Sequence, residues 1–460
     1  MKKIEQTVET KNSIDLQMEV SMEGETIIKR QADSLVGNFM RMLYTMMVDI
    51  SGDSDGKRML TRERVRSQTV DSVDFTSSAY IDLSNDVNWQ SGELVYLDTN
   101  YQAMNGFYYM VGDYNLEVYE VTFDRSTGDI TQGNRTDWSS LDSSKFDGNV
   151  DLVKFEFTSP NRSDYFFNNA NIIVGENNPS TSADIEDQWL ENINRKIDRT
   201  GTTITEPAVQ TNSSEITLSR QFTNNENYDV TVGEIGVITR CNDNNNYVLI
   251  ARDNVTDFTI AQGNSVTIEY KLTLDNSGDG GMMSQFHQLL YRHLRGTNRT
   301  VRDIFNNDQS DNRDEGTMVP ISIGGISEPS PWDNGLEGEY VGPIPGTGTT
   351  TVANTNTSLE SRVPHGTSDG TMVHYGTVGK QIVLNEANGE IYFDVVKPLE
   401  NQGSTTITIQ EQALYSAYYR GRENQYPYYS VMIARHTLNN SVNVAPGEIL
   451  KVSYRLKLTV

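Results

Sequence analysis

Alternation of hydrophobic and polar residues with a period of two dominates the chain. Residues 265–274 (SVTIEYKLTL) and 448–460 (EILKVSYRLKLTV) show it most clearly, and both stretches are rich in Val, Ile, Thr and Tyr. Gly or Asn residues stand at their borders. This pattern is typical of strands that bury one face and expose the other. We therefore predict a mainly β protein.

Two stretches have the spacing of three and four residues that indicates an amphipathic helix. In residues 32–48 the apolar stripe consists of Leu35, Phe39, Met42, Leu43, Met46 and Met47. In residues 281–296 it consists of Phe286, Leu289, Leu290 and Leu294. Asp33 or Ser34 is a candidate N-cap of the first helix, and Gly296 is a candidate end of the second.

Three further regions have their own character. Residues 14–29 (IDLQMEVSMEGETIIK) predict a strand, a Glu-Gly turn and a second strand. Between residues 69 and 168, short alternating stretches such as GFYYMVGDY and VDLVKFEFT predict a small all-β domain. Residues 324–376 are rich in Gly, Pro, Ser and Thr. We expect this last segment to be an arm that lies across a neighbouring molecule and adds a strand to its sheet.

The β-rich pattern occurs twice. Residues 214–237 and 389–414 each contain a Glu-led strand, beginning at Glu215 and Glu390, an Asn-containing turn and a second strand. Further along, Ile-Ala-Arg occurs at 250–252 and again at 433–435. Three more pairs of similar stretches are 263–274 with 447–458, 38–47 with 285–294, and 171–176 (NIIVGE) with 321–326 (ISIGGI). We interpret this order as a tandem duplication.

The predicted fold is mainly β, with tandem β-sandwich-like modules, two short helices and an inserted small all-β region. We place the N-terminal strands and first helix in 1–60, the inserted all-β domain in 61–170, the first β-module in 171–275, the second helix and a linker in 276–325, the Gly/Pro-rich extended segment in 326–388 and the second β-module in 389–460.

Each module is expected to hold a Glu–Arg pair across a hairpin. If Glu234 faces Arg252, the turn centres on residue 243, inside CNDNNN; if Glu411 faces Arg435, it centres on residue 423, inside RGRENQ. Both centres fall in turn-forming sequence, so cross-strand pairs are predicted. Two interpretations stay open. Exposed pairs would contribute about 0–1 kcal/mol, whereas breaking buried pairs would cost about 3–5 kcal/mol.

Charge and composition exclude several classes of protein. The 460 residues include 37 Lys and Arg against 63 Asp and Glu, a net charge of −26, which argues against direct binding of nucleic-acid phosphates. Cys241 is the single cysteine, so disulfide frameworks, iron–sulfur clusters and cysteine-based zinc sites are excluded. The sequence has no apolar stretch approaching 18 residues and no apolar N-terminal signal, so we expect no membrane association.

Few residues have the spacing of a chemical site. His287 and His293 are six apart on a predicted helix and do not share a face, and His365 and His374 lack an obvious third ligand. The acidic loops 51–56, 275–281 and 311–316 do not match the twelve-residue calcium loop. No P-loop, serine elbow or zinc-protease motif occurs. We predict no enzyme, no cofactor and no metal, and expect Cys241 to be inert.

Residues 222–237 (FTNNENYDVTVGEIGV), 249–255 (LIARDNV) and 263–274 resemble a module of virion proteins from tailed phages and tailed archaeal viruses. The usual form of that module has an Asn-rich turn, Val-Thr-Val, Glu-Ile-Gly-Leu-Tyr, Leu-Ala-Arg-Asp and a Gly-led last strand. The first copy keeps Glu-Ile-Gly at 234–236 and Ala-Arg-Asp at 251–253. The second copy lacks the glycine after Glu411 but has Leu-Tyr at 414–415.

The resemblance implies a non-enzymatic structural component of a tailed-virus particle, in the head vertex, neck or tail. It implies that the chain is made in a host cytoplasm, enters the virion, and assembles with copies of itself and with other virion proteins. Two alternatives are a receptor- or carbohydrate-binding fibre or spike protein, and a depolymerase or other hydrolase with paired carboxylates among the 63 acidic residues.

Overall fold

The structure is a computed structural model of the chain. It describes residues 3–9, 14–31, 35, 37–47, 59–62, 66–83, 87, 89–99, 101–123, 130–146, 149–158, 168–176, 189–190, 193–194, 197–241, 246–275, 280–295, 300–302, 308–310, 341–379, 382–385, 390–419 and 428–459. The predicted mainly β, sandwich-like fold is confirmed.

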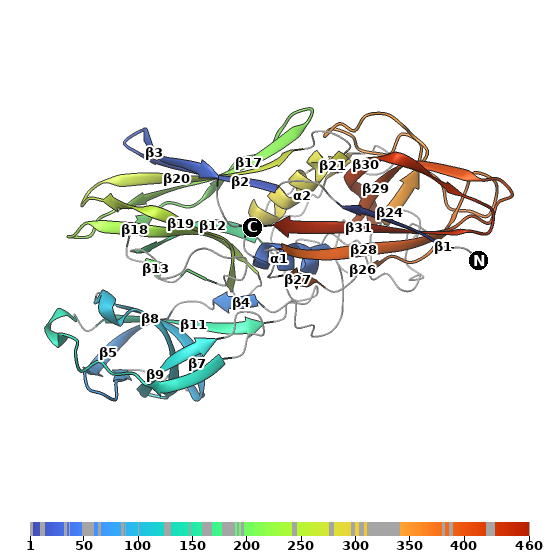
Figure 1. Cartoon of the computed structure of the whole chain (residues 1–460). Coiled ribbons are helices and arrows are strands. Elements are labelled where there is room, and N and C mark those ends of the chain that lie inside the picture. The colour runs from blue at the N-terminus through green and yellow to red at the C-terminus, as the bar shows by residue number, and fades with distance from the viewer. Residues whose placement is uncertain are drawn as a thin grey trace.

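The first of two β-sandwiches occupies one side of the main body (Figure 1). One sheet contains, in order, β17 (Ser213–Thr223), β20 (Ser265–Asp275), β2 (Ile14–Met22) and β3 (Glu25–Gln31). Along the outer side of β17 lie the short strands β14 (Asp198–Arg199), β15 (Thr203–Ile204) and β16 (Ala208–Val209). The other sheet contains β13 (Ile193–Asn194), β12 (Asn168–Glu176), β18 (Val230–Arg240), β19 (Tyr247–Ile260) and β4 (Met59–Arg62).

The hairpin predicted in residues 14–29 is confirmed, because β2 and β3 pair antiparallel. Glu23 and Gly24 form its turn, with φ of 52° and 86°. Positive φ at both central positions is the geometry that lets a tight turn follow the twist of the strands, and glycine adopts it at little cost.

The second sandwich lies on the opposite side of the main body. One sheet contains β1 (Lys3–Glu9), β31 (Ile449–Thr459) and β28 (Glu390–Glu400), with β25 (Val373–His374), β26 (Val378–Gly379) and β27 (Val383–Asn385) along β28. The other contains β21 (Gly280–Met282), β30 (Tyr428–Val444), β29 (Ile407–Tyr419) and β24 (Gly342–Gly346). The N-terminal segment therefore serves both sandwiches, since β1 pairs with β31 and β2 pairs with β20.

The strand registers of the two sandwiches correspond. Leu218 pairs with Tyr270 in the first sandwich, and Val395 pairs with Tyr454 in the second. In the facing sheets, the register shifts directly after Val237 in β18, and directly after the equivalent Leu414 in β29. Matching irregularities at matching places show that the two copies share one backbone plan.

Two details of the predicted alignment are wrong. Since Leu218 corresponds to Val395, Glu215 corresponds to Tyr392 rather than to Glu390. The sequence pattern did not reveal this error, because an alignment shifted by two residues keeps the same residues on the inward and outward faces of a strand. In addition, the strand that matches β12 is β24 and not 321–326, which lies outside the described residues.

The Gly/Pro-rich segment is therefore not the predicted arm over the described part of its length. β24 pairs with β29 of the same chain, and residues 347–363, called the strap below, fold over the second sandwich. The two prolines of β24 fit because the strand ends its sheet in the described residues, where a missing N–H leaves no inner partner unsatisfied.

The two helices, α1 (Gly37–Met47) and α2 (Ser284–Arg295), lie between the sandwiches (Figure 1). Both begin later than predicted. Leu35 forms a β-bridge with Ala251 before α1, and residues 280–282 form β21 before α2. The apolar stripes are buried as predicted wherever their side chains are described, at Leu35, Phe39, Met42, Leu43, Phe286, Leu289, Leu290 and Leu294. Asp33, Ser34 and Gly296 lie outside the described residues. A small hairpin of β22 (Thr300–Arg302) and β23 (Asp308–Ser310) follows α2.

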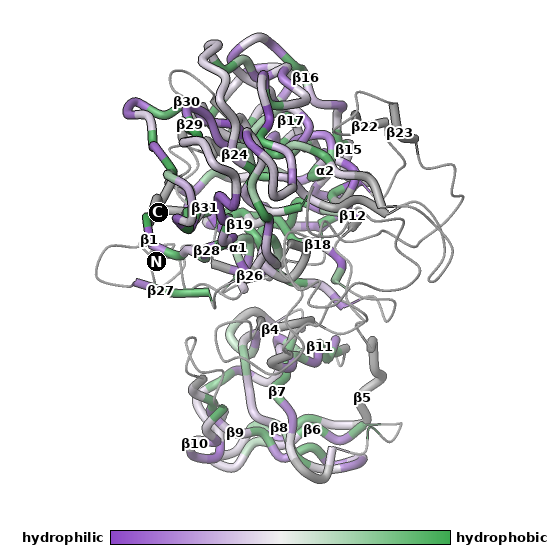
Figure 2. The backbone as a smooth tube through the Cα atoms, turned by 90° about the vertical axis from the view of Figure 1, so that its right-hand side faces the viewer, coloured by the Kyte–Doolittle hydropathy of each residue, from purple (hydrophilic) through white to green (hydrophobic). Residues whose placement is uncertain are grey.

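The inserted region is a small closed β-barrel that forms a separate lobe beside the first sandwich (Figure 2). β4 connects the two, because it pairs with both β11 and β19. Its strands run in the order β11 (Asn149–Thr158), β5 (Arg66–Asp74), β6 (Tyr80–Leu83), β9 (Asn115–Phe123), β8 (Gly106–Gly112) and β7 (Trp89–Thr99). β7 pairs again with β11, which closes the barrel. β10 (Ile130–Arg135) extends β9, and two short turns, η2 (Gln102–Met104) and η3 (Ser143–Lys145), complete it.

An aromatic seam joins the barrel to the first sandwich. The rings of Tyr96 and Phe107, of Phe107 and Phe155, and of Phe155 and Trp189 each lie 5.1 Å apart between centroids. The seam also contains Leu94, Val153, Ile173, Leu190, Ile238 and Leu249, which come from both units. The outer face of the barrel is thus fixed to the outer face of the sandwich sheet by buried edge-to-face contacts.

Candidate functional site

The structure brings both predicted Glu–Arg pairs together. In the first sandwich, Arg252 Nε donates to Glu234 Oε2 at 3.1 Å, and both side chains are 0% exposed. In the second, Arg435 donates to Glu411 Oε2 from Nε at 3.0 Å and from Nη2 at 2.7 Å. These side chains are 2% and 0% exposed. The interpretation as exposed pairs is therefore wrong, and both pairs belong to the interior.

The predicted register is wrong by two residues. Arg252 lies opposite Gly236 and Arg435 lies opposite Ala413, so each arginine reaches diagonally to a glutamate two positions along the partner strand. Residues i and i+2 of a strand share a face, and long side chains span that diagonal. The residue directly opposite is small in both copies. A Cβ on Gly236 would come within 2.9 Å of the Leu190 and Leu249 side chains.

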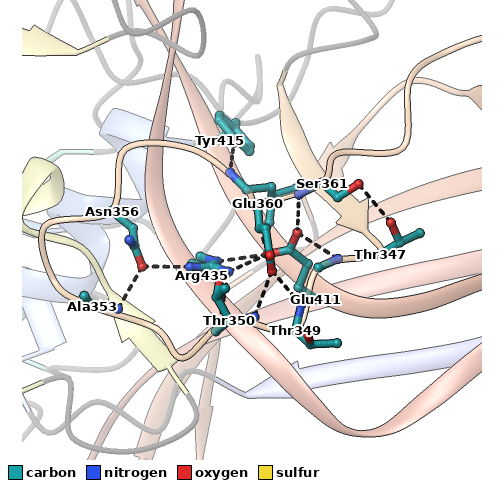
Figure 3. Close-up of polar contacts among 12 residues, drawn as sticks. Thr347, Thr349, Thr350, Ala353, Asn356, Glu360, Ser361, Glu411, Tyr415 and Arg435 are labelled. Carbon is teal, nitrogen blue, oxygen red and sulfur yellow. Dashed lines mark hydrogen bonds and ion pairs between the residues drawn. The ribbon is translucent and has the colours of Figure 1, made fainter.

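The strap covers the second pair and completes the hydrogen bonding of its carboxylate (Figure 3). Glu411 accepts backbone N–H groups from Gly348 at 3.2 Å, Ser361 at 2.9 Å and Glu360 at 3.3 Å. A buried carboxylate is tolerated only when its oxygens are paired and hydrogen-bonded. Arg435 and three strap amides meet that requirement.

The guanidinium of Arg435 is held by the same strap. Its Nη1 donates to Asn356 Oδ1 at 2.7 Å, and its Nη2 donates to Thr350 Oγ1 at 3.0 Å. Glu360 in turn accepts the N–H groups of Thr349 and Thr350 at 2.7 and 2.8 Å. These backbone hydrogen bonds lower the pKa of Glu360. The strap and the ion pair therefore fix each other.

Glycines in this segment are required by close approach. A Cβ on Gly346 would lie 2.6 Å from Glu411 Oε1, and a Cβ on Gly348 would lie 2.5 Å from the same atom. No larger residue fits while the backbone amides point at the carboxylate. Gly346 and Gly348 therefore allow the end of β24 and the start of the strap to pack on Glu411.

The sequence predicted an Asn-containing turn in each copy but did not identify the equivalent residues, Asn224 and Asn401, or their hydrogen bonds. Asn224 Nδ2 donates to the carbonyls of Tyr228 and Ile260 at 2.8 and 2.7 Å, and its Oδ1 accepts the N–H of Glu226 at 3.0 Å. Asn401 makes the same three bonds, with Thr405, Val444 and Gly403. Both asparagines are visible in the sequence, but the predicted alignment was shifted by two residues and therefore did not match Asn224 with Asn401.

The residue after the arginine differs between the copies. Asp253 accepts the hydroxyl of Tyr270 at 2.7 Å, and both are 0% exposed. In the second sandwich the same places hold His436 and Tyr454, whose rings lie 5.6 Å apart between centroids. Burial raises the pKa of Tyr454 well above its usual value. The two sandwiches therefore share the Glu–Arg pair but differ in the residue that follows the arginine, Asp253 in the first and His436 in the second.

The other candidate side chains are placed as follows. His287 Nδ1 lies 2.7 Å from Ser214 Oγ, and burial lowers the pKa of this histidine to about 3. The backbone N–H of His374 donates to His365 Nδ1 at 3.1 Å, so these two histidines are neighbours. Burial raises the pKa of Cys241 to about 12, so its thiol is not a nucleophile at neutral pH.

In the described ranges, no cluster of three or more His, Cys, Asp or Glu side chains is arranged to bind a metal ion. The acidic loops 51–56 and 311–316, most of 275–281 and the side chain of His293 fall outside those ranges. No helix in the described part of the chain is long and apolar enough to cross a membrane.

Comparison of the chain with models of protein families and with curated proteins, and of its fold with solved structures, finds no match.

Proposed function

We propose that this chain is a non-enzymatic structural component of a tailed-virus particle, located in the head vertex, neck or tail. One observation carries the proposal. The residues that resemble the virion module form the same buried pair, Glu234–Arg252 and Glu411–Arg435, at the same place in two equivalent sandwiches. Because the charged residues of the motif are buried, the motif determines the fold of the sandwich and does not form a ligand site. A stable sandwich that occurs twice in one chain suits a structural component of a particle.

The physical character of the frame supports this role. A buried ion pair gives little net stability but disfavours other registers, because each alternative leaves a charge without its partner. The strap adds backbone amides to the second pair, so its geometry is determined by several elements at once. The net charge of −26 keeps closely spaced copies soluble.

The proposed partners are further copies of the chain and other virion proteins, with no direct contact to nucleic acid and no membrane. Strand addition to an open sheet edge is a natural mode of contact. Among the described strands, β3 ends one sheet of the first sandwich and β1 ends one sheet of the second. Each edge offers a row of main-chain groups to a neighbouring strand.

The test is to purify particles on a density gradient and to quantify peptides of this chain by mass spectrometry. A constant ratio to the major capsid protein across the particle peak is expected. Absence of the chain from the particle peak, with recovery only in the soluble fraction, would refute the proposal. Light scattering of the purified chain over a concentration series measures its self-association.

The barrel favours a second candidate, a receptor- or carbohydrate-binding protein of a fibre or spike. It forms a lobe that projects from the main body (Figure 2). It also exposes Tyr114 at 53% and Ile130 at 36%. Aromatic side chains are common in sites that bind ligands. Binding of the full chain to a glycan array, lost in a Tyr114→Ala variant of unchanged stability, would favour this candidate.

A further inference from the structure

The two helices contact both halves of the chain, and some of these contacts involve equivalent strands. α1 packs on β19 of the first sandwich and also on β28 and β31 of the second. α2 packs on β30 of the second sandwich and also on β17 and β12 of the first. β19 corresponds to β30, and β17 corresponds to β28. Each helix therefore lies on the same strand of its own copy, β19 or β30, and on the same strand of the other copy, β28 or β17. The contacts of α1 with β31 and of α2 with β12 differ between the copies.

The matching extends to single residues. Leu35, just before α1, bridges to Ala251, and Met282, just before α2, pairs with Ala434. Both alanines are the central residue of the duplicated Ile-Ala-Arg triplet. The start of each helix is thus attached to the same point of its own sandwich.

Each helix also contacts the equivalent strand of the opposite copy, although through side chains at different positions. The ring of Tyr44 on α1 packs edge-to-face on Phe393 of β28, with centroids 5.2 Å apart. His287 on α2 lies 2.7 Å from Ser214 Oγ of β17. One continuous core contains both helices and both sandwiches, including Phe39, Phe286, Ile216, Phe393, Ile268 and Val452.

Reciprocity of this kind has a symmetry meaning. Two copies stacked head to tail bring surface A of one copy against surface B of the next, and the reverse contact does not form. Here the helix of each copy contacts the same strand of the other. That is the pattern of an isologous interface, in which the contacting surfaces are the same on both sides.

We propose that the chain is a covalently joined dimer of one helix-plus-sandwich unit, whose halves are related by an approximate two-fold axis between α1 and α2. The partner that each half fits is the other half. Since an isologous interface closes on itself, any larger assembly uses surfaces outside this helix layer. The inference is independent of the proposed function.

The test uses the full chain with a protease site inserted between residues 277 and 278, in the connection between β20 and β21. The folded protein is cleaved and the products are run on gel filtration over a dilution series. Both fragments are expected to co-elute at the volume of the intact chain. Fragments that separate on cleavage would overturn the proposal.

Matched variants test the reciprocity. Leu43 and Leu290 hold equivalent helix positions and are 1% and 0% exposed. Leu43→Ala and Leu290→Ala are each expected to raise the concentration at which the cleaved halves separate at least tenfold, because each opens a cavity in the shared core. Val266→Ala, inside the first sandwich on β20, is the control and should change this concentration less than twofold.

Two outcomes contradict the two-fold arrangement. An effect of only one of the two helix variants, in protein whose circular dichroism shows that it is folded, indicates a head-to-tail contact. The second concerns β1, which also links the halves by pairing with β31. If deletion of residues 1–9 alone releases the cleaved halves, the strand and not the helix layer holds them together.

Discussion

The first and second sandwiches keep the same Glu–Arg pair but differ in what surrounds it. Next to the arginine, the first has Asp253 bonded to Tyr270, and the second has His436 beside Tyr454. Opposite the arginine, the first has Gly236 and the second Ala413. The comparison teaches that register, the diagonal ion pair and the turn asparagine define the fold, whereas the neighbouring buried positions accept other chemistry.

The largest effect is expected from removing the arginine of either pair. Arg252→Met and Arg435→Met each leave a buried carboxylate without its cation, which costs about 3–5 kcal/mol of unfolding free energy. Thermal and urea unfolding measure the loss. The Arg435 variant should also expose the strap, residues 347–363, to proteolysis, because Asn356 and Thr350 no longer accept hydrogen bonds from Arg435.

A double variant separates charge from packing. Glu411→Gln in the Arg435→Met background removes the unpaired charge while keeping the acceptor for the N–H of Ser361. It is expected to recover part of the loss. If the double variant is no more stable than Arg435→Met alone, the cost comes from the lost arginine contacts and not from an isolated carboxylate.

The turn asparagines are expected to matter equally in both copies. Asn224→Ala and Asn401→Ala each take a donor from two carbonyl groups, and leaving such buried groups unsatisfied costs about 2–3 kcal/mol. Paired urea titrations of the two variants measure this. Losses that differ by more than about 1 kcal/mol would show that the copies do not use their asparagines alike.

Equivalent helix positions also differ between the copies: Met40 on α1 corresponds to His287 on α2. His287 has its pKa lowered to about 3 by burial, so the unfolded chain takes up a proton below pH 6.5 while the folded chain does not. Stability therefore falls as the pH falls from 6.5 towards 3, by about 1.4 kcal/mol per pH unit, or about 2 kcal/mol at pH 5.

His287→Met places the residue of the first copy in the second. The difference in stability between pH 7 and pH 5 should shrink by about 2 kcal/mol relative to the parent chain. Met40→Leu is the control, because it changes the matching helix without adding or removing a titratable group. An unchanged pH dependence in His287→Met would show that other groups cause the acid sensitivity.

Sequence patterns predicted the elements well and the geometry less well. Period-two alternation located the strands, and the repeated Ile-Ala-Arg marked equivalent positions in the two sandwiches. The diagonal Glu–Arg contact was missed because direct pairing of the two residues also places the hairpin turn in turn-forming sequence. In addition, two registers that differ by two residues bury the same face of each strand. The strap was missed because its glycines, such as Gly348, are selected by a carboxylate that is remote in sequence.

The smallest expected difference concerns a partly exposed ion pair of the second sandwich whose equivalent positions in the first hold no ion pair. Arg455 donates to Asp394 through Nε at 2.8 Å and Nη2 at 3.1 Å, and these side chains are 28% and 11% exposed. The equivalent cross-strand pair of the first sandwich is Thr217 with Lys271. Asp394→Thr therefore places the residue of the first sandwich in the second and removes the carboxylate. The expected cost is about 0.5–1 kcal/mol, since solvent screens pairs of this exposure.

Salt dependence identifies the origin of that cost. At an ionic strength of about 1 M the Debye length falls to about 3 Å, so the difference between Asp394→Thr and the parent chain should shrink by half or more. Lys271→Met in the first sandwich is the control and should respond to salt less strongly. A cost that stays constant in salt would assign it to the packing of Arg455 on the Tyr392 ring, 4.1 Å from its centroid, and would remove this charge pair from the differences between the copies.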